Sequence, residues 1–253
     1  MIRPMTMDWT PRTLAFLRDA GEYHPDYYQL LAQRILFYVK DRRHVCDVGC
    51  GAGGLSLALA GFCHHVTAID RAPLPLGLLR QEACRRGVEN LTVCCGDAGE
   101  LQPHSSFSAM VFCQFGDALT ALRLARRLCS GTAVIVTRSG ENRQLALQPA
   151  SPHRDHKRGC AQILEEYGIP YRSQVLTAEF GQPFRSVQDA AAFFRLYNKG
   201  VDVSEEAVEK LLQLTGRQDY PFYLPKQKRL GIFAVRTGDI PIRIEQAPQT
   251  GAF

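Results

Sequence analysis

A short apolar segment that runs directly into a glycine-rich turn constrains this chain more than any other feature. His44–Val48 is followed by the six residues Gly49–Gly54, four of which are glycine, and Leu55 to Ala60 then has a helical composition. Glycines at such a turn let the backbone approach a ligand closely, because no Cβ intrudes. The pattern predicts a strand, a tight turn and a helix, with a ligand site at the carboxyl end of the strand.

The same alternation continues as far as about Thr137. Further strands are expected at Val66–Ile69, Leu91–Cys95, Ala109–Cys113 and Ala133–Thr137, with helices at Leu78–Arg86 and Ala118–Cys129. Short apolar strands that alternate with helices are typical of βαβ units and of a sheet covered on both faces. We therefore predict an α/β, Rossmann-like fold built on a seven-stranded mixed sheet with helices on both faces.

The flanking segments complete a single predicted domain over residues 1–253. Residues 1–41 are expected to form N-terminal helices, 42–145 the ligand-binding half and 146–240 the second half of the sheet. Two helices, Ser186 to Gly200 and Ser204 to Gly216, form a helical insertion at 186–216 between the last two strands, Ser173–Phe180 and Gly231–Arg236. The tail, from about Gly238 and over 241–253, is expected to be loose.

Composition excludes several classes of protein. The nine cysteines are scattered, many of them in apolar runs, and form no CxxC pair. This distribution argues against a zinc ribbon or a disulfide framework and favours free thiols in the cytoplasm. The sequence has no stretch of about 18 consecutive apolar residues, so no transmembrane helix is expected. No signal peptide is expected either. The formal net charge of +5 is too small to indicate nucleic acid.

Three aspartates lie at the predicted strand ends. Asp47 precedes the first glycine by two residues, Asp70 follows Gly49 by 70 − 49 = 21 residues, and Asp97 ends the third strand. Asp47 would repel a pyrophosphate but could attract an ammonium group. A carboxylate at the position of Asp70 can accept both hydroxyls of a ribose. Asp97 could accept an adenine amino group.

With these residues the segment resembles motif I of the class I S-adenosylmethionine-dependent methyltransferases, an acid, any residue, then Gly-x-Gly-x-Gly. The resemblance runs from about Tyr27 to Arg236 and loosens beyond Thr137. It implies S-adenosyl-L-methionine as cofactor and S-adenosyl-L-homocysteine as product. By resemblance, the residues that line the methionine part are Gly49, Cys50, Gly51 and Gly53.

The resemblance also implies contacts with the rest of the cofactor. Asp70 would hold the ribose and Arg71 would flank the adenine, whose amino end would meet Asp97 and Ala98. Gln114 and Phe115 would lie beside the sulfonium, and either Tyr27 or Tyr28 would close over the methionine end.

The acceptor of the methyl group is less constrained. Cys113-Gln114-Phe115-Gly116 stands where nucleic-acid amino methyltransferases carry Asn/Asp-Pro-Pro-Tyr/Phe, which argues against nucleic acid. We expect transfer to an O, N or S atom of a small molecule under a cover formed by the inserted helices, without a membrane partner. A homodimer, the oligomeric state and the identity of the acceptor stay open.

A basic neighbourhood follows the fifth strand, at Arg138, Arg143 and His153–Arg158. One hypothesis is an acidic acceptor held by Arg138 and Arg154. The other is a solvated helix start.

The general base is equally open. His153 and His156 are candidates, with Asp117 and Glu141 as rivals. His153 and Cys160 would lie ~10 Å apart along one helix. They cannot share one ion with His156, and no metal is expected.

Two other functions fit part of the pattern. One is an NAD(P)-dependent oxidoreductase, although Asp47 and the Gly49-x-Gly51-x-Gly53 spacing differ from Gly-x-Gly-x-x-Gly. The other is a scaffold that binds the cofactor without catalysis.

Overall fold

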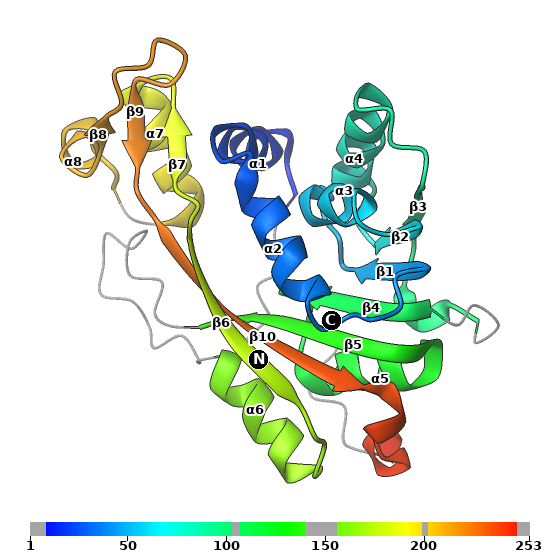
Figure 1. Cartoon of the computed structure of the whole chain (residues 1–253). Coiled ribbons are helices and arrows are strands. Elements are labelled where there is room, and N and C mark those ends of the chain that lie inside the picture. Colours follow the sequence, from blue (N-terminus) through cyan, green and yellow to red (C-terminus); the bar gives the residue numbers. More distant parts are fainter. Residues whose placement is uncertain (1–8, 103–106, 140–155, 199–201, 247–253) are drawn as a thin grey trace.

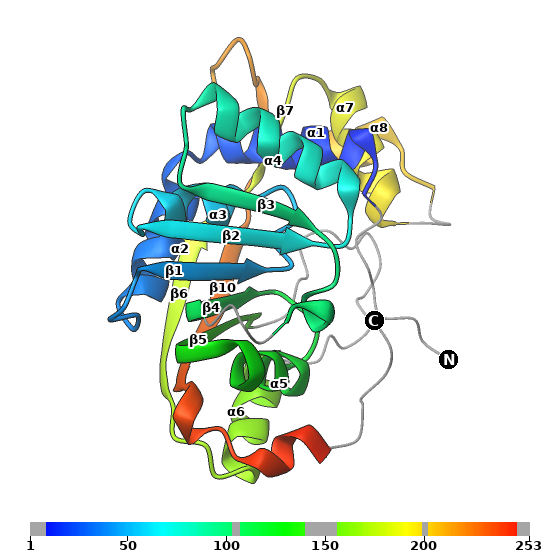
Figure 2. The ribbon, with the colours of Figure 1, turned by 90° about the vertical axis from the view of Figure 1, so that its right-hand side faces the viewer.

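A mixed sheet of seven strands runs through the protein in the order β3-β2-β1-β4-β5-β10-β6 (Figures 1 and 2). The structure is a computed structural model that describes residues 9–102, 107–139, 156–198 and 202–246. The strands are β1 His44–Val48, β2 His65–Asp70, β3 Leu91–Cys95, β4 Phe107–Cys113, β5 Cys129–Arg138, β6 Arg172–Glu179 and β10 Gln227–Arg236. Strands β1 to β5 pair in parallel, whereas β10 is antiparallel to both β5 and β6. The predicted fold class is confirmed.

Helices cover both faces of this sheet, as predicted. The helices in the described ranges are α1 Pro11–Tyr23, α2 Asp26–Leu36, α3 Gly54–Ala60, α4 Pro73–Arg85, α5 Ala118–Leu128, α6 His156–Glu166, α7 Val187–Tyr197 and α8 Glu205–Glu209, of which α7 and α8 do not pack on this sheet. Because side chains alternate along a strand, Val45 of β1 packs with α2 and α3, while Cys46 and Val48 pack with α5. None of the helices in the described ranges is long and apolar enough to cross a membrane.

A separate unit is inserted between β6 and β10, beside α1 (Figure 1). It contains α7 and α8 together with an antiparallel sheet of order β7-β9-β8, formed by Gln182–Phe184, Phe222–Leu224 and Gln213–Leu214. Phe16 of α1 packs edge-on against Phe184 and Phe193 of this unit, with ring centroids 6.1 and 5.1 Å apart. The sequence predicted the two helices of the insertion but missed its sheet.

The second inserted helix is shorter than predicted. Instead of continuing to Gly216, α8 ends at Glu209. Val208 is fully buried and Leu212 is half-buried, but Leu211 is 43% exposed and Leu214 is 80% exposed. Residues 213–214 pair with β9 instead, because an edge of that strand lies within reach.

The predicted loose tail is wrong over residues 238–246. Short 3₁₀ turns at Thr237–Asp239 and Ile242–Gln246 bring Ile240 and Ile244 into the core beside α5. Arg123 Nε donates to the Ile244 carbonyl and Arg126 Nη1 to the Ile240 carbonyl, each at 2.9 Å. Residues 247–253 lie outside the described part of the chain.

We expect Ile244→Ala to lower the free energy of unfolding by about 2–5 kcal/mol, because it leaves a cavity at a fully buried position. Ile242→Ala, at a side chain that is 65% exposed, is the matched control and should change stability by less than about 0.5 kcal/mol. Urea unfolding of both variants makes the comparison. Equal effects at the two positions would show that the tail does not contribute to the core.

Candidate functional site

The glycine-rich turn between β1 and α3 is held in a conformation that side chains rarely adopt. Gly49, Gly51 and Gly53 have φ values of 72°, 54° and 74°. The amides of Gly49 and Cys50 both donate to the Ile69 carbonyl of β2, at 2.8 and 3.1 Å. A Cβ at Gly49 would lie 2.6 Å from the Phe115 ring, so this close packing also requires glycine. The turn is therefore fixed by the neighbouring strand.

Asp70, at the end of β2, also holds the turn in place, through its side-chain carboxylate. Its Oδ2 accepts the Gly51 amide at 2.8 Å and its Oδ1 accepts the Ala72 amide at 2.9 Å. A carboxylate has about four lone-pair sites, so both oxygens can accept a further bond from a ligand hydroxyl. Asp70 can thus position the turn and bind a ligand together.

Asp97 follows β3 and forms an ion pair with Arg71, which follows β2. Its Oδ1 also accepts the Gly99 amide at 2.7 Å. That backbone hydrogen bond, with the Arg71 guanidinium, lowers the pKa of Asp97 from its usual value. The pair places a carboxylate and a planar cation side by side after the ends of β3 and β2.

Asp47 lies beneath the turn and is 1% exposed. Ser56 of α3 donates its hydroxyl to Oδ2 at 2.6 Å. Burial raises the pKa of Asp47 to about 6, a rise that the Ser56 hydrogen bond opposes and the charge of Asp70 adds to. A buried carboxylate of this kind is stabilised when a cationic group is placed beside it.

A cavity of about 1290 Å³ joins these groups at the carboxyl ends of the strands. It is larger than the ~300–1,000 Å³ that small-molecule sites usually occupy, which leaves room for two ligands. Of the residues predicted to bind the cofactor, those that line it are Tyr28, Asp47, Gly49, Cys50, Gly51, Gly53, Asp70, Arg71, Asp97, Ala98, Gln114 and Phe115. The structure thus brings twelve of thirteen into one cavity; their contacts with a cofactor stay predictions.

The sequence left open whether Tyr27 or Tyr28 contacts the cofactor site, and the structure distinguishes their positions. Tyr28 lines the cavity, and its ring lies 2.5–2.8 Å from where a Cβ on Gly54 would stand. Tyr27 does not line the cavity; it is 5% exposed and its ring packs 4.1 Å from that of Phe180. Tyr28 is therefore the tyrosine in contact with the site.

Gln114 ends β4 in an unusual backbone conformation. Among the described residues it alone has a positive φ, 55°, without being glycine. Its Oε1 accepts a hydrogen bond from Nε of Arg138 at 2.7 Å, and its amide donates to Val136 at 2.8 Å. Strained residues of this kind concentrate at ligand sites. Gln114 and Arg138 both line the cavity, and their hydrogen bond joins the ends of β4 and β5 there.

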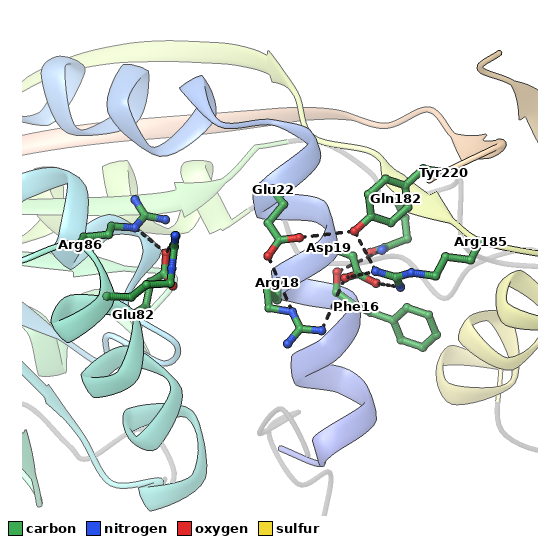
Figure 3. Close-up of polar contacts among 10 residues, drawn as sticks. Phe16, Arg18, Asp19, Glu22, Glu82, Arg86, Gln182, Arg185 and Tyr220 are labelled. Atoms are coloured by element: carbon green, nitrogen blue, oxygen red, sulfur yellow. Dashed lines mark hydrogen bonds and ion pairs between the residues drawn. The ribbon is translucent and has the colours of Figure 1, made fainter. Parts of the chain in front are cut away.

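Helix α1 supplies a wall that sequence analysis missed. Trp9 lies over the turn, with its ring 3.0 Å from a Cβ position on Gly51. Arg18 and Glu22 also line the cavity, across from Glu82 and Arg86 of α4 (Figure 3). A single tryptophan just before the Thr10-Pro11 helix start is a signal that could have identified this wall.

Several predicted candidates lie outside the described residues, namely His153, Arg154, Arg143 and Glu141. His156 begins α6, whose side chains are described only from Gly159 on.

Two further residues have structural contacts. Asp117, a rival candidate for the base, is the N-cap of α5, and its two oxygens accept the Thr120 amide and hydroxyl at 3.0 Å each. Cys95 is exposed because β3 is an edge strand, and its thiol contacts the Arg71 carbonyl.

Comparison with known proteins identifies the segment that carries the site. Residues 45–140 match a family model described as a methyltransferase domain. Protein-L-isoaspartate O-methyltransferase of Magnetococcus marinus is 30% identical over 122 residues, 46% of this chain and 54% of that protein. Ribosomal RNA small subunit methyltransferase G of Methylobacillus flagellatus is 28% identical over 111 residues, 41% of this chain and 54% of that protein. The chain spans about half or less of the length of the curated relatives it matches.

A solved structure extends the likeness to most of the fold. Magnesium protoporphyrin IX methyltransferase of Synechocystis, with bound S-adenosylhomocysteine, superimposes with a TM-score of 0.50 at 14% identity, covering 87% of this chain and 85% of that one. These matches give no support to the nicotinamide alternative. Residues 45–140 therefore match a methyltransferase domain, and the glycine turn and all three strand-end aspartates lie inside this segment.

Proposed function

We propose that the protein transfers a methyl group from S-adenosylmethionine to an O, N or S atom of a small molecule. The observation that carries this proposal is the cavity itself. It gathers Asp47, Asp70 and Asp97 around one glycine turn, and it continues past Gln114 to Arg138.

The residues present fit the cofactor. The turn between β1 and α3 leaves space that a Cβ would fill at Gly51, where Trp9 is the nearest neighbour. Asp47 offers a buried carboxylate to the ammonium of the methionine part, Asp70 accepts the ribose hydroxyls, and Asp97 accepts the adenine amino group. When bound, the cofactor supplies a methyl group on a positively charged sulfur.

The protein contributes mainly alignment, since methyl transfer is an in-line displacement. Tyr28 and Trp9 narrow the cavity over the turn, and the Arg138–Gln114 hydrogen bond holds the end of β4 where the acceptor would approach. His153 and His156 stay our candidates for a base, which is needed only when the acceptor must lose a proton.

Support for a small-molecule acceptor comes from this chain rather than from its relatives, whose names mention a protein, an RNA and a porphyrin. The end of β4 lacks the Asn/Asp-Pro-Pro motif. Helix α1 lines the cavity through Leu17 and Arg18, and the inserted unit lies beside α1 (Figure 1). All nine cysteines are free, which supports a reducing compartment such as the cytoplasm.

Asp70→Ala should abolish detectable binding of S-adenosylhomocysteine in calorimetric titration, because it removes the ribose acceptor and releases the Gly51 amide. Asp41→Ala, at an aspartate paired with Arg43 outside the cavity lining, should bind like the wild-type protein. NADH should not bind either one. Micromolar NADH binding without binding of S-adenosylhomocysteine would overturn the proposal.

Gly54→Ala should weaken S-adenosylhomocysteine binding several-fold, because the new methyl group would displace the Tyr28 ring from the cavity wall. The matched control is Gly77→Ala in α4, where a Cβ meets nothing within 4 Å and should favour the helix slightly. Titration of both variants with the same ligand makes the test. Unchanged affinity in Gly54→Ala would mean that Tyr28 does not contact the cofactor.

Affinity for S-adenosylhomocysteine should rise about tenfold from pH 5 to pH 8, because Asp47, with its pKa raised to about 6, must lose its proton to pair with the ammonium. The contribution of Asp47 to the stability of the unliganded protein changes with pH in the opposite direction. Its Asp47 binds more protons than the unfolded chain between about pH 4 and 6, so that contribution is lost as the pH rises through 6.

Asp47→Asn is the control for this pH dependence. It should bind weakly, with an affinity that no longer changes between pH 5 and 8. An unchanged slope in Asp47→Asn would assign the titration to another group.

A further inference from the structure

A lysine lies in an otherwise apolar row on β10. Alternation along the strand puts Lys228 on the same face as Leu230 and Ile232, which are 1% and 0% exposed and pack in the core beside α2. The Lys228 Nζ lies 4.0 Å from the ring centroid of Phe180 and 5.2 Å from that of Tyr27. The ammonium is therefore held among aromatic rings.

No carboxylate in the described ranges lies within 4 Å of the Lys228 or Lys226 ammonium group. The nearest candidate by strand pairing is Glu179, opposite Gln227. Its Oε1 accepts the hydroxyl of Tyr223 and the backbone amide of Lys226, and its Oε2 accepts the Gln227 side-chain amide at 2.6 Å. Glu179 is thus engaged by neutral donors, and neither ammonium group has an ion-pair partner in the described part of the chain.

A third cation lies on the neighbouring strand. Arg138 ends β5, lines the cavity and pairs with Leu230, two residues after Lys228 on β10, so the side chains of Arg138 and Lys228 lie on the same face of the sheet. Burial, the charge of Lys226 and then that of Arg138 lower the pKa of Lys228 to about 7. Burial and Arg138 lower the pKa of Lys226 to about 8. An anion placed among the three would relieve both the burial and the mutual repulsion.

Of the three cations, Arg138 lines the cavity and donates to Gln114, whereas neither lysine is among the lining residues. Cys113 also lines the cavity, and the charges of Lys228 and Arg138 oppose the rise in its pKa that burial causes. Tyr28 connects the two regions, because its ring lines the cavity and meets the Phe180 ring at 5.6 Å.

We propose that Arg138, Lys226 and Lys228 form a subsite for an anionic oxygen group, carboxylate or phosphate, on the small acceptor molecule, beside the rings of Tyr28 and Phe180. This inference rests on the proposed function, because the bound molecule is a methyl acceptor only if the protein transfers a methyl group. The anion subsite itself can be tested independently of that function. Lys228 acts here as a cation that binds and orients, and it takes up a proton when the anion binds.

The direction of the pH effect separates this role from that of a base. An anion requires charged lysines, so its affinity should fall as the pH rises from 6.5 to 8.5, through the pKa values of Lys228 and Lys226. A neutral lysine that removes a proton would require the reverse.

Other groups that face Lys228 and whose pKa values are perturbed do not titrate in this window. Burial raises the pKa of Cys113 to about 12 and holds those of Tyr27 and Tyr28 well above their usual range. Burial also lowers the pKa of His24 below 6.5, despite the opposing charge of Glu179.

The test measures binding of benzoate, phenyl phosphate and the neutral benzamide to protein saturated with S-adenosylhomocysteine. The wild-type protein should bind benzoate or phenyl phosphate at least about tenfold more tightly than benzamide. This preference should shrink from pH 6.5 to 8.5. The tighter of the two anions identifies the group the subsite prefers.

Lys228→Met keeps the apolar stem and should retain the fold, because a thioether suits the apolar row better than an ammonium group. It should lose the preference for anions while its affinities for benzamide and S-adenosylhomocysteine stay unchanged. Lys210→Met, at an exposed lysine that ends α8, is the matched control and should behave like wild type.

Equal binding of benzoate, phenyl phosphate and benzamide, no binding of either anion, an affinity that rises with pH, or an unchanged preference in Lys228→Met would each overturn the subsite. Failure of S-adenosylhomocysteine to bind would instead overturn the proposed function. The same probes would then be measured without it, and the anion subsite would be judged on that result.

Discussion

The hydrogen bond from the Gly51 amide to Asp70 is the interaction on which the site depends. It joins the turn after β1 to the end of β2, and the Ala72 amide holds the same carboxylate from the far side. Because the Ile69 carbonyl also accepts two amides of the turn, the loop is built against β2 rather than standing free. One carboxylate thereby sets the path of the backbone and remains available to a ligand.

The wall opposite this loop depends on a contact far away in sequence. Asp19 of α1 is 2% exposed and accepts hydrogen bonds from Arg185 of the inserted unit at 2.5 and 3.0 Å (Figure 3). Gln182 adds a bond to the Phe16 carbonyl at 3.0 Å. Helix α1, which lines the cavity through Arg18 and Glu22, is therefore held in place by the insertion, so that the inserted unit shapes the site through α1.

The features that could be predicted from the sequence are those encoded in short contiguous segments of the chain. The strands, the glycine turn and the three strand-end aspartates are written in contiguous segments, and their meeting at one sheet edge follows from parallel topology. The end of α8, the docked tail and the role of Lys228 depend on partners many residues away. Leu214 is apolar yet 80% exposed, and Ile244 is in a Pro/Gln-rich tail yet fully buried. Neither outcome is visible in local pattern.

The net charge of +5 does not show how the charged residues are arranged around the cavity. The three strand-end aspartates lie at the turn end of the cavity, where Arg71 pairs with Asp97, whereas Arg138 lines the cavity beyond β4. Cys113 lines the cavity at the end of β4, and burial raises its pKa, a rise that the charge of Asp47 adds to and the charges of Lys228 and Arg138 oppose. The buried Asp47 carboxylate favours a cationic group beside the turn, whereas Arg138 favours an anionic group beyond Gln114, because opposite charges attract. This arrangement supports the proposed transfer between two ligands that face each other across Gln114.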